Sequence, residues 1–372
     1  MEGTAIARVE VYGYELTYVG EEYVMSGGRS IASLASTVVR VVTEDGVEGF
    51  GETCPLGSTY LAAHAEGARA ALRELAPAVV GVDPAGFLAL GDRMDAVLTG
   101  HEYAKSAIDV ACWDAAARAQ GVSVTTLLGG LRNESYPLYV AIPLSDPSAM
   151  AEHVTALRSE GITRFQLKVG DSPCVDADRV RAVLARCGHE DVVVADANGR
   201  YTTQEGVAAV GMLAGLERVY VEQPCPTLEA CRYVRERSAL PFVLDECISD
   251  VPSLMRAHEA RAMEAFNLKI SKVGGLTKAR QMRDLADALG LTVTIEDTWG
   301  GDLVTAAVSH LAASTKARTL FTVSFMNDWT NEHVAGYEPR SSGGRGSAPT
   351  GPGLGVEVDL GRLGAPLWST AE

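Results

Sequence analysis

The sequence predicts an α/β protein in which eight parallel strands close into a barrel, preceded by a smaller segment of antiparallel strands and helices. Three observations carry this prediction. Beyond residue 135 short apolar runs alternate with amphipathic stretches, eight such runs recur at near-constant spacing, and residues 1–120 have a different pattern. Strand–helix alternation produces parallel strands joined by right-handed crossovers. Eight evenly spaced strands fit a closed barrel better than an open sheet.

The first part of the chain predicts antiparallel strands followed by helices. The run ARVEVYGYEL alternates over part of its length, and Asp45-Gly46 marks a turn between two strand-like runs. From about residue 62 to residue 120 the pattern is helical and rich in Ala, Leu and Arg, with interruptions at GVDPAG and LTGH. We expect an α+β domain over residues 1–130.

The barrel is expected over residues 131–340. Its eight apolar runs lie at residues 138–144, 164–170, 192–198, 219–224, 242–246, 265–270, 292–297 and 320–325. Seven of them are followed by a helical pattern, whereas the eighth enters an irregular tail rich in Gly, Pro and Ser. We therefore expect the tail, residues 341–372, to take the place of the last helix and to return to the N-terminal domain.

Charge and composition exclude several functional classes. The chain has 372 residues, of which 47% are hydrophobic and 22% charged, as is ordinary for a globular enzyme. The net charge of −16 argues against a nucleic-acid partner, which needs a basic face. No apolar run approaches the length of a membrane span, and the first residues show no secretory signal. The seven cysteines are scattered without a CxxC pair, which predicts reduced thiols in a cytoplasmic protein.

Titratable residues stand at the carboxyl ends of six consecutive predicted strands. They are Lys168, Asp196, Glu222, Asp245, Lys269 and Asp297. Each follows the previous one by about one strand–helix unit, so all six are expected at one mouth of the barrel, where barrels of this type carry their chemistry.

Three of these residues predict a metal site. Asp196, Glu222 and Asp245 follow three adjacent strands, and three neighbouring carboxylates repel one another unless they share a divalent cation. The absence of His and Cys among them favours Mg²⁺ over Zn²⁺. Taken singly, each acid could instead form a salt bridge or cap a helix.

Lys168 and Lys269 flank the acids, one on the preceding strand and one on the following strand. Closure of the barrel is expected to place their amines on opposite sides of whatever binds the metal. A nearby dication lowers the pKa of a lysine, so that one amine can remove a proton and the other can return one. Alternatively, the two lysines merely neutralise the acids.

Together the segments QLKVG, ADAN, VEQP, LDE and NLKISKVGG resemble the enolase superfamily, in particular its muconate-lactonizing-enzyme-like group. The similarity covers nearly the whole chain, including residues 104–121. It implies a modified TIM barrel, (β/α)7β, beneath an α+β capping domain that the C-terminal tail completes. It also implies Mg²⁺ held by Asp196, Glu222 and Asp245, and an even-numbered homo-oligomer.

The sequence departs from the family at one position. Many members carry Lys-x-Lys on the second strand, where this chain has Gln166-Leu167-Lys168. The base position is kept, but one positive charge near the substrate carboxylate is missing. No histidine occupies a strand end, so the Lys/His pairing of mandelate racemases is not available.

The resemblance implies removal of the proton α to a carboxylate, with Mg²⁺ stabilising the developing negative charge. A lysine on each face predicts a 1,1-proton transfer, hence a racemase or epimerase acting on a small-molecule carboxylate. If the β-carbon carries a leaving group, the same enolate expels it, which makes the enzyme a dehydratase. The barrel sequence leaves both outcomes open.

The expected mouth loops at residues 21–30, 51–67 and 296–302 look most similar to members that act on cyclic amino acids. These are hydroxyproline-betaine or proline-betaine epimerases and cis-3-hydroxyproline dehydratases. The candidate substrate contacts are Tyr60, Gln166, Asn198, Asp297, Trp299 and Phe325. Asp297 would pair with a cationic nitrogen, and the three aromatic rings would offer faces to a quaternary ammonium unless they simply pack.

Two rival functions are weighed against this one. A lysine late in a parallel barrel can be the Schiff-base nucleophile of a metal-independent aldolase, but that reading leaves three convergent acids unexplained. A catalytically silent binding or scaffold protein has no need to keep both lysines and all three acids.

Overall fold

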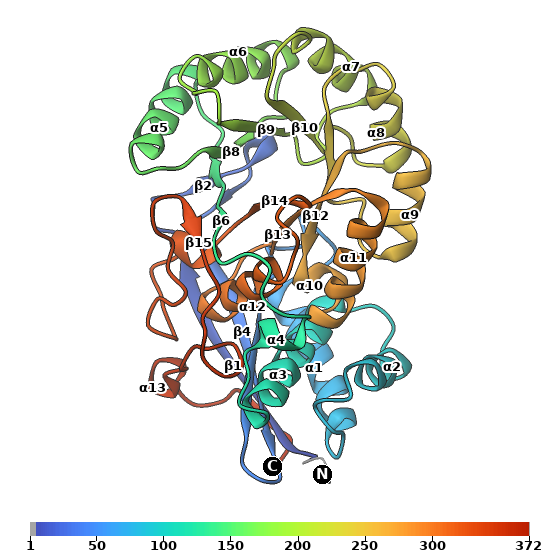
Figure 1. The fold of residues 1–372 in the computed structure, drawn as a ribbon, viewed down its shortest axis with the longest axis vertical. Helices are drawn as coiled ribbons and strands as arrows, with labels where there is room; N and C mark the ends of the chain where they lie inside the picture. Colours follow the sequence, from blue (N-terminus) through green and yellow to red (C-terminus); the bar gives the residue numbers. More distant parts are fainter. Residues whose placement is uncertain (1–4, 372) are drawn as a thin grey trace.

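The computed structural model describes residues 5–371, which form a β/α barrel and a smaller strand-and-helix unit beside it (Figure 1). Eight parallel strands form the barrel in the sequential order β14-β13-β12-β11-β10-β9-β8-β7. They are β7 (Val140–Ile142), β8 (Arg164–Lys168), β9 (Val192–Asp196), β10 (Val219–Glu222), β11 (Phe242–Leu244), β12 (Ala265–Lys269), β13 (Thr292–Glu296) and β14 (Leu320–Val323). The sheet closes on itself where Tyr139 donates its backbone N–H to the carbonyl of Val323, at 2.9 Å.

Helices surround this barrel as an outer ring (Figure 1). They are α5 (Pro147–Ser159), α6 (Pro173–Leu184), α7 (Thr203–Met212), α8 (Leu228–Arg235), α9 (Val251–Glu259), α10 (Ile270–Val273), α11 (Leu276–Leu289) and α12 (Asp302–Ala313). Helices α7 and α9 begin with reciprocal capping boxes at Thr202 and Asp250, which satisfy backbone N–H groups of the first turn. The element directly after β14 is the short 3-10 turn η2 (Met326–Trp329) and not an eighth barrel helix, so the predicted (β/α)7β barrel is confirmed.

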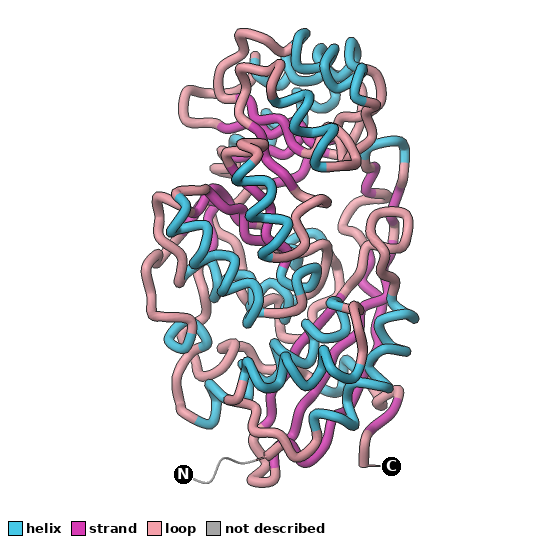
Figure 2. The backbone as a smooth tube through the Cα atoms, turned by 90° about the vertical axis from the view of Figure 1, so that its right-hand side faces the viewer, coloured by secondary structure: helices cyan, strands magenta, loops and turns pink. Residues whose placement is uncertain are grey.

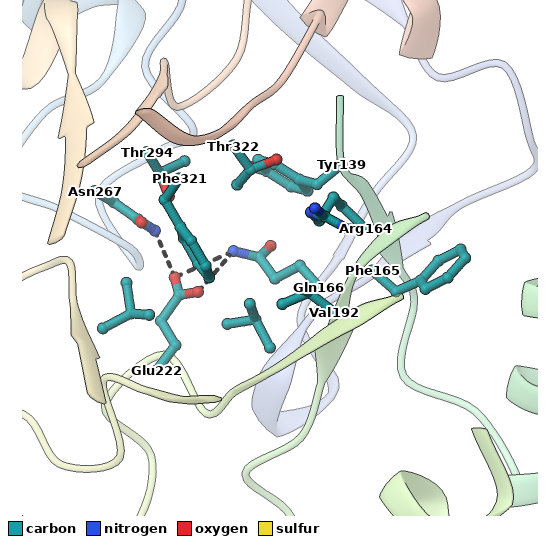
Figure 3. A pocket seen from close by; sticks show the side chains of 12 residues that line it. Tyr139, Arg164, Phe165, Gln166, Val192, Glu222, Asn267, Thr294, Phe321 and Thr322 are labelled. Atoms are coloured by element: carbon teal, nitrogen blue, oxygen red, sulfur yellow. Dashed lines mark hydrogen bonds between the residues drawn. The ribbon is translucent and has the colours of Figure 1, made fainter. Parts of the chain in front are cut away.

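The interior of the barrel is less apolar than usual for this architecture, whose inward layers are dominated by Val, Ile and Leu. Alternation along β8 turns Phe165 and Leu167 outward into the core beneath the helices. The inward positions instead include Gln166, Asn267 and Thr294, which border a small internal pocket with Glu222 (Figure 3). The barrel interior can therefore hold a buried charge.

The smaller unit, called the cap below, is built on an antiparallel sheet of order β16-β1-β4-β5. Its strands are β16 (Trp368–Ser369), β1 (Ile6–Thr17), β4 (Ser33–Thr43) and β5 (Glu48–Thr53), and its helices are α1 (Ala65–Val79), α2 (Phe87–Val97) and α3 (Glu102–Ala119). The helices pack beside the sheet (Figure 2). The close approach of β5 to α3 requires glycine, because a Cβ on Gly51 would lie 2.1 Å from the carbonyl oxygen of Ala107.

The C-terminal tail returns to the cap, since β16 pairs antiparallel with β1 at Val11 and Trp368. On its way it passes α3, where the backbone N–H of Leu354 donates to Asp114 at 2.7 Å. The remaining short elements are β2 (Tyr23–Val24), η1 (Ser26–Gly28), β3 (Ser30–Ile31), α4 (Val124–Leu127), β6 (Tyr136–Pro137), β15 (Arg345–Gly346) and α13 (Leu360–Leu363).

Two buried carboxylates of the cap bind the N-termini of barrel helices. Glu52 accepts from the backbone N–H groups of Gly301 and Val304, at 3.0 and 3.1 Å, at the start of α12. Asp109 accepts from the N–H of Thr277, at 3.0 Å, at the start of α11. An anion at a helix N-terminus is stabilised by the free N–H groups and the helix dipole. These bonds hold the cap over the barrel mouth.

Among the described helices, none is both long and apolar enough to cross a lipid bilayer.

Candidate active site

The predicted catalytic and metal-binding residues lie at one edge of the barrel. Lys168, Asp196, Glu222 and Lys269 are the last residues of β8, β9, β10 and β12, and Asp245 directly follows β11. The strand register pairs the Cα of Asp196 with those of both Lys168 and Glu222. All five side chains are buried.

Lys168 and Lys269 border the same cavity. Their strands, β8 and β12, are four apart in the closed eight-stranded order, so the two lysines enter the cavity from opposite sides of the barrel. This agrees with the arrangement that the sequence predicts for two bases.

Each amine is bound to an acid. Lys168 Nζ donates to Asp196 Oδ2, and to Gln166 Oε1 at 3.0 Å. Lys269 Nζ donates to Asp245 Oδ2, and to Tyr60 Oη at 2.8 Å. These ion pairs keep both amines at the mouth of the barrel.

The protein's own charges raise the pKa of both lysines. Burial is the largest single influence on Lys168 and disfavours its ammonium form, but the charges of Asp196, Tyr23 and Glu222 together outweigh burial and raise the pKa well above its usual value. For Lys269 burial is again the largest single influence, and the charges around it, led by Asp245 and Glu296, together outweigh it and raise the pKa. The lowered pKa expected from the sequence is thus not produced by these contacts, because that expectation counted the charge of a bound dication.

Glu222 lies between Asp196 and Asp245, and the negative charges of both disfavour its ionised form. Burial raises its pKa well above the usual value, and the charges of Asp196 and Asp245 raise it further. Its carboxylate accepts from Gln166 Nε2, at 3.0 and 3.1 Å, and from Asn267 Nδ2, at 2.7 Å (Figure 3). Two neutral amide donors are thus its hydrogen-bond partners.

The donor set of these acids fits Mg²⁺ in its chemistry. Asp196, Glu222 and Asp245 offer only carboxylate oxygens. The raised pKa of Glu222 comes first from burial and then from the negative charges of Asp196 and Asp245, which a cation would offset. Within residues 5–371, however, no three His, Cys, Asp or Glu side chains stand close enough together to hold a metal ion. Asp196 and Asp245 are each turned to a lysine instead. A cation would have to compete with these ammonium groups for the acids.

Three of the residues predicted to touch substrate hold the charged groups in place. Tyr60 donates its hydroxyl to Asp245 Oδ2 at 2.7 Å. Gln166 joins Lys168 to Glu222: its carbonyl oxygen accepts from Lys168 Nζ, and its amide nitrogen donates to Glu222. Asn198 Nδ2 donates to Asp196 Oδ2 at 2.9 Å, while Asn198 Oδ1 is buried without a partner. All three border the cavity.

The other three predicted contacts differ from one another. Trp299 borders the cavity with its indole N–H buried and unpartnered. Asp297 also borders the cavity, but its carboxylate accepts from the N–H groups of Ser271, at 3.0 Å, and Thr298, at 2.7 Å. Phe325 does not border the lysine cavity: it packs edge-on against Tyr136 and lines a neighbouring pocket, which shares Tyr23, Tyr139 and Trp329 with that cavity.

Sequence reasoning missed Glu296 and a cluster of aromatic side chains. Glu296 borders the cavity, as do Tyr23, Tyr139 and Trp329. The alternation of β13 could have identified Glu296, because Thr294 and Glu296 are two residues apart and share the inward face. No sequence signal groups the aromatic rings, which come from distant segments; the centroids of Tyr23 and Trp299 lie 5.6 Å apart.

Loops of the cap close the mouth, as expected. Tyr23 and Met25 come from the first predicted loop, and Leu56 and Tyr60 from the second. The hydroxyl of Ser26 donates to the carbonyl oxygen of Asp196 at 3.1 Å. The cavity measures only about 30 Å³, which is room for one or two water molecules. Side chains or cap loops must therefore shift to admit a cyclic carboxylate.

Comparison with known proteins shows which family the chain belongs to. Residues 24–129 match the mandelate racemase / muconate lactonizing enzyme N-terminal domain, and residues 149–362 match the enolase C-terminal domain-like family. The chain belongs to the enolase superfamily. The predicted resemblance and the TIM-barrel class are thereby confirmed. The chain is an enzyme, which sets aside the scaffold alternative, and its membership of this superfamily sets aside the metal-independent aldolase.

Three members of the enolase superfamily illustrate the similarity. A cis-3-hydroxy-L-proline dehydratase from Roseibium aggregatum is 43% identical over 97% of this chain and 98% of its own. An N-succinyl-L-Arg/Lys racemase from Bacillus cereus is 26% identical over 95% of both chains. A crystal structure of an enolase superfamily member from Roseovarius nubinhibens ISM, complexed with magnesium, superposes with a TM-score of 0.92 at 34% identity, covering 98% of each chain.

Proposed function

We propose that this enzyme removes the α-proton of a cyclic amino acid and expels a β-hydroxyl group, with cis-3-hydroxy-L-proline as substrate. One observation carries the proposal: two buried lysines reach a single cavity from opposite sides, with three acids on the strands between them. The 43% identity to a cis-3-hydroxy-L-proline dehydratase supports the choice of substrate. The epimerase expected first from the sequence thus becomes the second candidate.

The stereochemistry of this substrate requires groups on both ring faces. In cis-3-hydroxy-L-proline the hydroxyl and the carboxylate share one face, so the α-hydrogen lies on the other. One lysine would accept the α-proton, while the ammonium group of the other would protonate the departing hydroxyl. The Cα–H and Cβ–O bonds break, a Cα–Cβ double bond forms, and the hydroxyl leaves as water. Lys168 and Lys269 supply the two groups.

Asp196, Glu222 and Asp245 would hold Mg²⁺, which would stabilise the second negative charge that develops on the substrate carboxylate. Gln166 positions Lys168 and Glu222 relative to each other, and Tyr60 positions Lys269 and Asp245. The closed cap excludes water, which strengthens every charge interaction inside the cavity.

The second candidate is a 1,1-proton transfer, which the same lysine pair favours. On a substrate without a 3-hydroxyl group, such as proline or a betaine of proline or hydroxyproline, the second lysine would return a proton to Cα from the opposite face. The reaction is then an epimerisation, and the protein machinery is unchanged.

The deciding experiment incubates the enzyme with Mg²⁺ in deuterated water. The panel contains cis- and trans-3-hydroxy-L-proline, both proline enantiomers, and the betaines of proline and hydroxyproline. We expect loss of cis-3-hydroxy-L-proline with release of water, and α-deuteration without elimination for proline. Turnover of a betaine alone would favour the epimerase, and the absence of both elimination and deuterium uptake throughout the panel would refute the proposal.

We further propose that the enzyme forms a homo-oligomer. Light scattering after size-exclusion chromatography tests this proposal by measuring the molar mass in solution.

A further inference from the structure

We infer that Glu296, and not Asp297, binds the positively charged nitrogen of the substrate, so that the enzyme selects amino acids with a cationic α-nitrogen over analogues with an uncharged nitrogen. This inference rests on the proposed function, because it needs a cyclic amino acid in the lysine cavity. It assigns a role to a buried acid that neither the metal site nor the two bases use.

Glu296 stands where the nitrogen of such a substrate is expected. It is the last residue of β13, and its Cα pairs in the sheet with that of Lys269 on β12. Its side chain is 2% exposed and borders the cavity. A base that removes the α-proton must lie beside Cα, and the nitrogen is bonded to Cα. A carboxylate next to Lys269 is therefore placed next to that nitrogen.

One carboxylate oxygen of Glu296 accepts no hydrogen bond from the protein and can accept one from a ligand. Tyr139 donates its hydroxyl to Oε2, which fixes the orientation of the group. Oε1 lies 3.3 Å from Lys269 Nζ yet accepts no hydrogen bond, since that amine donates to Asp245 and Tyr60. A buried acceptor without a partner costs free energy, which a ligand N–H or cation would recover.

Asp297 has no such freedom. Residues 296 and 297 of an extended chain point to opposite sides. The carboxylate of Asp297 is bonded to Ser271 in the short helix α10, which directly follows β12. Its oxygens accept from Ser271 N–H, Ser271 hydroxyl and Thr298 N–H. These bonds connect α10 with the loop that follows β13, so we assign the cation-binding role to Glu296 in place of Asp297, which the sequence suggests.

Aromatic rings complete a site for a cation. Tyr23, Tyr139, Trp299 and Trp329 border the cavity together with Glu296. The centroids of Trp299 and Trp329 lie 5.6 Å apart, and Tyr23 is 5.9 Å from Trp329. Ring faces attract cations and offer nothing comparable to an uncharged nitrogen. The acid and the rings thus favour the same class of ligand.

The test compares two ligands that differ in the charge on nitrogen. L-Proline has a cationic ring nitrogen, whereas pyrrole-2-carboxylate has the same ring size and carboxylate with an uncharged nitrogen. Calorimetry with Mg²⁺ present measures the Kd of each for the wild-type enzyme, Glu296→Gln and Asp297→Asn. The second variant is the matched control, because it removes the neighbouring charge with the same change of chemistry.

We expect Glu296→Gln to raise the Kd of L-proline by about tenfold or more and that of pyrrole-2-carboxylate by less than about threefold. Asp297→Asn should change both constants by a similar factor. Glu296→Asp keeps the charge and should recover part of the preference for L-proline, which guards against a variant that merely folds poorly. Equal losses of both ligands in Glu296→Gln, or a charge-selective loss in Asp297→Asn alone, would overturn the inference.

The outcome separates this inference from the proposed function. Charge-selective binding without α-deuterium exchange would support the role of Glu296 and refute the proposed reaction. Exchange of the α-proton of proline with no charge-selective effect in Glu296→Gln would do the reverse. Binding of neither ligand by the wild-type enzyme would overturn both.

Discussion

Lys168 and Lys269 lie on strands four apart in an eight-stranded barrel, and both border one cavity. No pair of strands in such a barrel is further apart, so the two amines approach the cavity from opposite sides. Their ion pairs, with Asp196 and Asp245 respectively, link each base to an acid on the adjoining strand. Glu222 is the last residue of β10, the strand midway between them.

We expect Lys168→Ala and Lys269→Ala each to abolish net turnover, because elimination and epimerisation both need a group on each face. Either single variant keeps the opposite base and should still exchange the α-proton of one proline enantiomer. Chiral chromatography and proton NMR in deuterated water measure the two effects separately. Full turnover by either variant would contradict the two-lysine assignment.

Removal of Mg²⁺ with EDTA should stop α-proton exchange, and added Mg²⁺ should restore it. Asp245→Asn should lose Mg²⁺ binding and activity together, since it removes a carboxylate charge from the expected ligand set. Titration calorimetry with MgCl₂ checks binding, and NMR exchange checks activity. An active variant that binds no Mg²⁺ would disprove the ligand role of Asp245.

Gln166→Leu should destabilise the fold by about 1–3 kcal/mol, because it leaves buried Glu222 with one donor fewer and Lys168 with one acceptor fewer. Urea unfolding measures the difference in free energy of unfolding. Gln120→Leu is the control, since the side chain of Gln120 donates to the carbonyl of Ala116 at the end of α3 and is exposed. Its effect should stay within about 0.5 kcal/mol. Equal effects of the two changes would show that the Gln166 bridge contributes little.

His310 should make the fold less stable as the pH falls. The ring is buried in α12, where Nδ1 accepts from the Thr125 N–H at 3.2 Å and Nε2 donates to the Leu354 carbonyl at 3.0 Å in the neutral tautomer. Burial lowers the pKa of His310 to about 4. The unfolded chain has an ordinary pKa of about 6.5 and therefore binds the proton first. Stability from this group is complete above about pH 6.5 and is lost towards pH 4, by roughly 3 kcal/mol.

Urea unfolding at pH 7 and pH 4.5 tests this expectation in the wild-type enzyme and in His310→Gln. The variant cannot take up the proton, so its stability should fall less over the same interval. Parallel losses in the two proteins would show that His310 does not control the acid sensitivity.

The barrel itself was predictable because its signals are local. Each of the eight apolar runs became a strand, and seven were followed by helices. The strand ends then had to meet at one edge, since parallel strands in a closed sheet all end on the same side. Lys168, Asp196, Glu222, Asp245 and Lys269 could accordingly be grouped before their contacts were known.

The choice between Glu296 and Asp297 could not be made in the same way. Both are acids at the end of one strand, and the residue that points inward depends on where the chain leaves the sheet. Asp297 accepts from its neighbour Thr298 and from Ser271, which lies in the short helix α10 directly after β12, about one strand–helix unit earlier in the sequence. Phe325 shows the same limit, since its packing against Tyr136 depends on a segment from the start of the barrel.

The sequence alone determined which elements form, in what order they join, and which charged residues stand at their ends. These properties follow from hydrophobic periodicity and from the fixed direction of parallel strands, which neighbouring residues along the chain already specify. The tertiary structure decided which of the two neighbouring carboxylates keeps an oxygen free of hydrogen bonds, which amide joins Lys168 to Glu222, and which rings surround the site. Those outcomes depend on hydrogen bonds and packing between segments far apart in the sequence, and only the folded chain brings such segments together.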